Sequence, residues 1–463
     1  MNPELSRNAW LELTPMRRWA LPLTIVLVAF TALLLNPLAS IEKQFEILAF
    51  TGLGLFAVFA SLGSVKAMQT VTNEITGNTW DAQRLSHHVP REFLVGKLFG
   101  STVFEWCGAG LSLLVFIAGR SVATPAALLV LDVVTLVGIA LLLQAGGLFM
   151  SLASANAVRS TRRPGRTVAG QGVGLIVGLV MATMIFPMVM ELITYKHGFE
   201  AVAWWLPVPL RLFVPLSVYV FLGWTVAGAL RLIRAELQEP VSPAPWLWFL
   251  GFVTVYLYPL TVGELFSSVE SGFLAFLATG AMVFGSTVLP LVLGERKDVV
   301  RLRTLAAAWV RGDRIAVRDQ LPLWTYTLAG FALWVLALGV ASALFLSKGG
   351  LVAFVFGLGV LALLLRDVGI VMAVHLAARP SREPGMVVGF YMVMLYAFAP
   401  FVASVMGVEA LMILLFPPLA ALPMASVGVP LSLAAGALGA SACAVPWVAA
   451  VPRVRAALKA ADG

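Results

Sequence analysis

The run ILAFTGLGLFAVFASLGSV, residues 47–65, contains no charged side chain and no proline. A helix needs about 20 apolar residues to cross a bilayer. Other uncharged runs that are at least as long include Trp19–Ile41, Thr167–Met190, Ser271–Gly294 and Gln320–Ser347. Of the 463 residues, 60% are hydrophobic and 12% are charged, whereas soluble domains are about 25% charged. A water-soluble enzyme is therefore excluded, and the sequence predicts an all-α polytopic membrane protein.

The distribution of positive charge predicts the topology. We expect twelve transmembrane spans: 20–40, 47–65, 98–118, 127–152, 168–191, 211–231, 243–263, 271–293, 321–346, 350–374, 386–407 and 428–450. A cytoplasmic N-terminus places 26 of the 31 Lys and Arg residues on the inner side, as the positive-inside rule requires. Both termini are then cytoplasmic, and the net charge of +8 needs no nucleic acid to explain it. The proline-rich stretch 410–425 is expected to be re-entrant or interfacial on the outer face.

A shift of 220 residues superimposes the two halves of the chain. Arg159, Arg162, Pro164, Gly165 and Val168 then coincide with the same residue types in the second half, at positions 379, 382, 384, 385 and 388. An even number of spans in each half predicts two parallel six-helix repeats. The expected domains are 1–235 and 246–463, joined by a linker at 236–245 that contains three prolines. The alternative is a chance similarity between two Arg-Pro-Gly loops.

The sequence offers little catalytic chemistry. Gly96-Lys97 is the nearest match to a phosphate-binding loop, but Leu98 follows where Ser or Thr is required. The four histidines do not have metal-ligand spacing, and the two cysteines lie within apolar runs, which excludes a disulfide framework and a thiolate metal site. We expect no enzymatic activity, no metal and no cofactor in this chain.

The first large hydrophilic loop, 66–97, is the most informative segment. Asn78 or Thr79 is expected to cap a short helix, on which Asp81 and Arg84 lie one turn apart and can pair. Gly77 and Pro90 bound this helix. We expect Trp80 and Leu85 to be available to a partner, because a plain solvated linker, the alternative interpretation, needs neither a tryptophan nor helix stops at both ends.

This loop resembles the one between the second and third spans of type-2 ABC exporter permeases. The resemblance rests on Glu74, Gly77, Thr79-Trp80-Asp81, Leu85-Ser86, Pro90 and Gly96-Lys97. It implies that the loop carries a coupling helix that docks on a separately encoded ATP-binding subunit, in two copies, where Mg-ATP is hydrolysed. The implied coupling residues are Glu74, Gly77, Thr79, Trp80, Asp81, Arg84, Leu85 and Pro90.

The resemblance has further implications. Residues 2–18, with Trp10, Leu11, Leu13 and Met16, resemble the family's amphipathic interface helix. The family's outer re-entrant helices would correspond to Glu200–Leu210 and Ala410–Ala425. The second-half loop, 295–321, keeps Glu295, Arg301 and Arg303 as coupling candidates but lacks the Gly-x-Thr-Trp-Asp pattern. The implied location is a bacterial-type inner (plasma) membrane.

Two carboxylates fall inside predicted spans, Glu105 and Asp132. A charged group deep in the membrane costs about 2.5–3.5 kcal/mol on insertion scales. We therefore expect each carboxylate either to line a translocation path or to be held by structural partners. Three functions follow: an exporter permease; a twelve-span secondary transporter, for which these carboxylates would couple an ion gradient; or a membrane scaffold or enzyme acting on lipid-linked substrates. Of these three, we expect the exporter permease.

Overall fold

The computed structural model describes residues 6, 10, 12–85, 89–161, 202–203, 207–237, 239, 241–262, 269–295, 299–375, 384–398 and 452. The chain forms two compact units, Met1–Val241 and Ser242–Gly463. The boundary between them falls inside the proline-containing segment 236–245.

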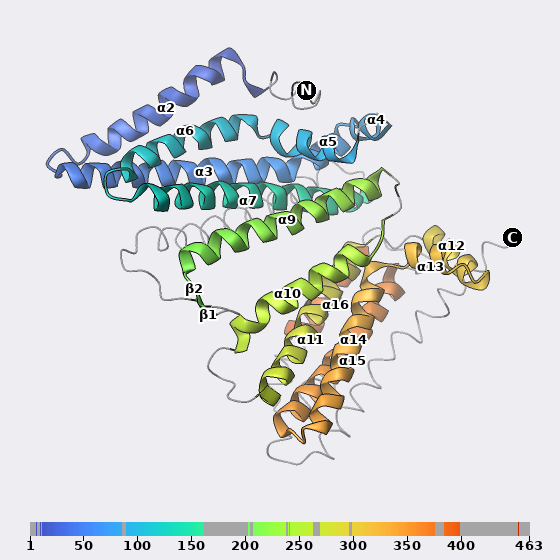
Figure 1. Cartoon of the computed structure of the whole chain (residues 1–463). Coiled ribbons are helices and arrows are strands. Elements are labelled where there is room, and N and C mark those ends of the chain that lie inside the picture. Colours follow the sequence, from blue (N-terminus) through green and yellow to red (C-terminus); the bar gives the residue numbers. More distant parts are fainter. Residues whose placement is uncertain are drawn as a thin grey trace. The chain divides into compact units, whose positions relative to one another are not determined.

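Unit 1 is built from long helices with two short ones inserted between them (Figure 1). Its described elements are α2 (Pro15–Leu34), α3 (Ile41–Thr76), α4 (Trp80–Leu85), α5 (Pro90–Val95), the π-helical turn η1 (Gly96–Gly100), α6 (Val103–Arg120), α7 (Ala126–Thr161), β1 (Val202–Ala203), β2 (Pro207–Val208) and α9 (Leu210–Glu236). Helix α3 packs against both α6 and α7, and α7 packs against α9. At 1.5 Å per residue, the 36 residues of α3 extend well beyond a hydrocarbon core of about 30 Å.

Glycines allow α3 and α6 to approach closely. A Cβ atom on Gly52 of α3 would lie 2.3 Å from the backbone nitrogen of Phe116 on α6, and one on Gly119 would lie 2.3 Å from the backbone nitrogen of Ala49. Lipid gives no hydrophobic driving force between helices, so close van der Waals packing over small residues holds such pairs together. The contact lies near the start of α3 and the end of α6.

Unit 2 has α10 (Ala244–Val262), α11 (Val269–Gly294), α12 (Val299–Val310), α13 (Arg314–Gln320), α14 (Leu323–Leu344), α15 (Lys348–His375), α16 (Pro384–Val393) and the π-helical turn η3 (Met394–Phe398). Helix α11 packs against α14, α15 and α10. In this unit aromatic rings pack directly against glycines. A Cβ atom on Gly280 would lie 2.5 Å from the ring of Trp334, and one on Gly330 would lie 2.5 Å from the ring of Phe284.

Eight helices in the described part of the chain are long and apolar enough to cross a membrane. Many apolar side chains on them point outward: Leu23 of α2 is 70% exposed, and Leu344, the last residue of α14, is 75% exposed. An outward apolar surface of this extent is suited to lipid. The prediction of an all-helical integral membrane protein is thus confirmed. The predicted spans 168–191 and 428–450 and the stretch 410–425 lie outside the described residues, as do residues 2–5, 7–9 and 11 of the N-terminal segment.

One local expectation was wrong. The segment 200–210 does not form a re-entrant helix over its described residues, because β1 and β2 pair there as antiparallel strands, with Val202 opposite Val208 and Ala203 opposite Pro207. Prolines at 207 and 209 explain this, since proline disfavours helix for the residue that precedes it and lacks the backbone N–H that a helix interior needs.

Candidate functional site

The coupling candidates of unit 1 lie where α3 ends and α4 begins. Helix α3 continues to Thr76, so the hydrophilic loop starts later than the sequence suggested, at Gly77. Asn78 adopts a left-handed conformation with φ 56°. The backbone N–H of Thr79 donates to the carbonyl of Glu74 at 2.9 Å, and its hydroxyl donates to the same oxygen at 3.3 Å. These residues therefore close the end of α3. Helix α4 begins at Trp80, directly after Thr79, and the expectation that Asn78 or Thr79 caps it stays a prediction.

Trp80 is not available to a partner, contrary to the sequence-based expectation. Its side chain is 2% exposed, and its ring meets that of Phe93 on α5 edge-on, with centroids 5.5 Å apart. The indole Nε1–H donates to Oε2 of Glu236, at the end of α9, at 3.3 Å. A large apolar ring with one polar tip is stable when its body is buried and its N–H finds an acceptor, and both conditions are met inside unit 1.

The exposed surface of α4 and α5 is polar instead. Asp81 on α4 and both Arg91 and Glu92 on α5 are exposed, and Val89 between the helices is 54% exposed. Pro90 opens α5, where a missing N–H costs nothing. The side chains of Arg84 and Leu85 lie outside the described residues, so the predicted pairing of Arg84 with Asp81 stays a prediction.

Glu74 also points into the unit. It forms an ion pair with Lys97 of η1, whose side chain is completely buried, and the Lys97 ammonium lies 5.2 Å from the ring centroid of Phe93. A buried ammonium requires such a counter-charge. The pair joins the end of α3 to the turn that leads into α6.

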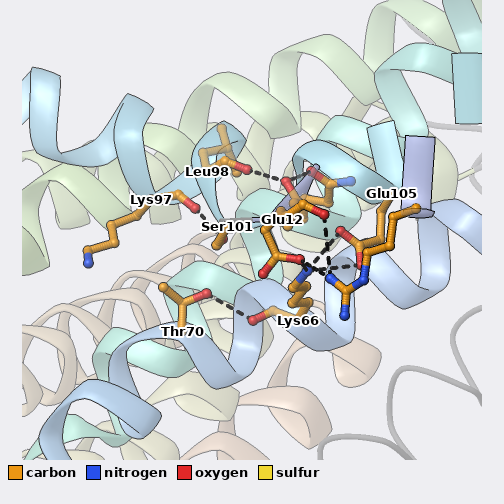
Figure 2. Close-up of polar contacts among 10 residues, drawn as sticks. Glu12, Lys66, Thr70, Lys97, Leu98, Ser101 and Glu105 are labelled. Atoms are coloured by element: carbon orange, nitrogen blue, oxygen red, sulfur yellow. Dashed lines mark hydrogen bonds and ion pairs between the residues drawn. The ribbon is translucent and has the colours of Figure 1, made fainter. Parts of the chain in front are cut away.

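Glu105 is held by a second ionic cluster. Nζ of Lys66 on α3 lies 3.3 Å from Oε1 of Glu105 and 2.7 Å from Oε2 of Glu12, and Arg17 also contacts Glu12, at 3.0 Å. Figure 2 shows Glu12, Lys66 and Glu105 converging, while the Lys97 side chain points away from them. Two cations balance two carboxylates, which satisfies the buried Glu105 and fastens the N-terminal segment to α3 and α6. The position of Glu105 within a predicted span indicates that it needs a partner, but no sequence pattern identifies Lys66 as that partner.

Asp132, on the second turn of α7, is 5% exposed. Arg120 and Arg211 act on it electrostatically. Within the described ranges its Oδ2 atom has no hydrogen-bond partner. Glu105 and Asp132 belong to separate ionic groups, so the structure does not bring the two candidate path residues together.

Unit 2 contains a buried group that the sequence indicated only in part. Arg366 and Asp367 of α15, which are adjacent in the sequence, form an ion pair, with a guanidinium nitrogen 3.0 Å from Oδ1. Tyr396 of η3 adds a hydroxyl that donates to Oδ2 of Asp367. Tyr396 was not singled out from the sequence, because an isolated tyrosine in an apolar run carries no pattern. The group ties α15 to the turn after α16.

The second-half loop differs from the first. Glu295 accepts a hydrogen bond from the backbone N–H of Leu323 at 2.8 Å, so it joins the end of α11 to the start of α14. Arg303 is half-buried, and the Arg301 side chain lies outside the described residues. The largest exposed apolar groups in this loop are Trp309, Val310 and Ile315, which sequence reasoning missed.

Across the described ranges, no three His, Cys, Asp or Glu side chains lie together in a way that could hold a metal ion. The chain matches no protein-family model, no curated protein and no solved structure. The sequence and the fold thus establish an all-helical, polytopic integral membrane protein that requires a lipid bilayer.

Proposed function

We propose that this chain is the permease subunit of an ATP-driven exporter, with both half-permeases in one polypeptide. The two units support the proposal through the order of their elements: two long helices, a pair of short ones, then two more long helices. Helices α3, α6 and α7 recur about 220 residues later as α11, α14 and α15. Twelve spans in two parallel repeats, with both termini cytoplasmic, belong to this proposal, as does a bacterial-type inner membrane.

The observation that carries the proposal is the bracing of α4 and α5. Trp80 fastens α4 to α5 and α9, and the Glu74–Lys97 pair fastens α3 to η1. A segment that receives force from a partner must be linked rigidly to the helices that it moves, because a flexible loop would absorb the displacement. These contacts link the two short helices to three membrane helices.

In this mechanism the chain itself hydrolyses nothing. Mg-ATP is bound and cleaved on two copies of a separate ATP-binding subunit, one of which contacts the exposed polar surface formed by Asp81, Arg91 and Glu92. The buried members of the segment, Glu74 and Trp80, transmit the movement rather than touch the partner. The two six-helix halves then alternate between inward-open and outward-open states.

A secondary transporter is the second candidate, and Asp132 is the observation that favours it. A buried carboxylate oxygen without a hydrogen-bond partner among the described residues is a candidate for binding a proton or a cation. Glu105, the other coupling carboxylate of this alternative, already has Lys66 as its counter-charge, which makes it less suited to that role.

Co-purification with a candidate ATP-binding cassette protein, such as one found encoded beside this gene, tests the proposal. We expect Asp81→Arg and Arg91→Glu each to reduce the amount of ATPase recovered, because they reverse exposed charges on α4 and α5. Lys43→Glu is the matched control, an equally exposed charge reversal at the opposite end of α3, and should leave recovery unchanged. Transport that continues without the ATPase and stops with a proton uncoupler would establish the secondary transporter instead.

A further inference from the structure

The turn between α12 and α13 presents apolar side chains outward. Trp309 is 71% exposed, Val310 is 85% exposed and Ile315 is 69% exposed. Gly312, with φ +72°, makes the turn, and the Asp313 side chain caps α13 by accepting from the backbone N–H of Ala316 at 3.0 Å. The turn is therefore well defined, and its exposed apolar groups are held in place. We call residues 309–315 the hairpin tip.

The base of this hairpin is tied to the ends of two membrane spans. Glu295, after α11, accepts from the first backbone N–H of α14. The hydroxyl of Tyr326, in the first turn of α14, donates to the carbonyl of Arg318 on α13 at 2.9 Å. Figure 1 shows α12 and α13 extending sideways from the end of the α11, α14 and α15 bundle rather than continuing its axis. The hairpin thus lies near the level at which the spans leave the bilayer.

Positive charge surrounds the apolar groups. Arg311, Arg314 and Arg318 are exposed, while the acidic groups nearby are engaged: Asp313 in the cap, and Asp319 with Arg318 at 3.1 Å. Tryptophan and arginine together are typical of segments at the membrane surface, where the ring enters the headgroup layer and the guanidinium meets lipid phosphate. The positive-inside rule predicts that this face is cytoplasmic, the side on which the leaflet carries anionic lipid.

We propose that the hairpin tip lies in the headgroup layer of the cytoplasmic leaflet and binds anionic phospholipid. Three features favour lipid over a protein partner: the position beside the span ends, the sideways direction of the hairpin, and the mixture of apolar and basic groups. The proposal does not depend on the exporter assignment, because a membrane surface faces this hairpin in any membrane protein of this fold.

Depth measurement on the full chain tests the proposal. Val310→Cys and Ile315→Cys, each made in a Cys107→Ser, Cys443→Ser background, are spin-labelled and reconstituted into phosphatidylcholine vesicles with and without phosphatidylglycerol. Collisions with oxygen report the bilayer, and collisions with a water-soluble nickel chelate report the aqueous phase. Thr304→Cys is the control, since it is exposed and lies about 140° around α12 from Trp309, at 3.6 residues per turn.

We expect the labels at 310 and 315 to favour oxygen when phosphatidylglycerol is present, and the label at 304 to favour the nickel chelate. In the added variant Arg311→Gln/Arg314→Gln, the difference between the two lipid compositions should be lost. Labels at 310 and 315 that meet nickel as readily as 304 would overturn the proposal and leave the tip free for a protein. Protection from both reagents would overturn it too, because it would place the tip against this chain itself.

Discussion

Substitutions of Trp80 distinguish two possible roles of this residue, a buried structural contact that braces α4 and a surface contact with the ATPase. Trp80→Ala removes a side chain that is 2% exposed, and truncation of a buried aromatic ring costs about 3–5 kcal/mol. Trp80→Phe keeps a ring facing Phe93 but loses the N–H that donates to Glu236. A hydrogen bond to a charged group contributes about 1.5–3 kcal/mol, and we expect the lower end because Glu236 is only half-buried.

Unfolding in mixed micelles of increasing SDS fraction, followed by circular dichroism, measures these losses. The matched control is Trp309→Ala, which truncates the same residue type at a 71% exposed position and should change the unfolding free energy by less than about 0.5 kcal/mol. We expect wild type and Trp309→Ala to be about equally stable, Trp80→Phe to be less stable than both, and Trp80→Ala to be the least stable.

Association with the ATPase completes the comparison. If Trp80 is a brace, Trp80→Phe retains the partner while Asp81→Arg loses it. The opposite result would refute this reasoning: a Trp80→Ala protein as stable as wild type that no longer binds the ATPase. Trp80 would then be a surface contact, as the sequence alone suggested, and its burial against Phe93 and Glu236 would not describe the functional state.

Three further predictions use the same unfolding assay. Lys97→Met leaves the Glu74 carboxylate without its counter-charge and should cost about 3–5 kcal/mol, and the added change Glu74→Gln should recover part of that loss. Gly52→Ala forces a Cβ atom against the α6 backbone and should cost about 1–3 kcal/mol, whereas Gly54→Ala, which meets no atom of the described residues within 4 Å, should be neutral. Tyr396→Phe removes the hydroxyl donor to the buried aspartate of α15 and should cost about 1.5–3 kcal/mol; a silent substitution would show that this contact does not hold η3 against α15.

Membrane spans were predictable because their signal is local and additive. A run such as 47–65 sums the transfer free energy of some twenty side chains, so no single misjudged residue changes the result. The fate of Trp80 was not predictable in this way. Its hydrogen-bond acceptor, Glu236, lies 156 positions along the chain, and an aromatic residue in a polar loop suits either a partner's surface or a local core. Only the return of α9 to the same end of the unit decides between them.

Ionic pairs escaped prediction for the same reason. Glu105 was expected to need a partner, but its cation, Lys66, lies 39 positions earlier on a different helix. Lys66 is also one of the positive charges that the positive-inside rule places on the inner side, so it has both roles at once. A charge pattern indicates that compensation must exist, but the helix packing selects which cation supplies it.

The acidic residues at the start of the two hydrophilic loops, Glu74 and Glu295, have a similar structural role in the two units. Glu74 pairs with Lys97, and Glu295 accepts from the backbone of Leu323, so in both units the carboxylate closes its loop onto the following span. What remains exposed then differs: charged groups such as Asp81 in unit 1, and Trp309 among arginines in unit 2. A polar surface suits a protein partner that binds and releases, whereas an apolar, basic one suits lipid. The missing Gly-x-Thr-Trp-Asp pattern in the second loop therefore indicates a different surrounding for that loop rather than a weakened copy of the first.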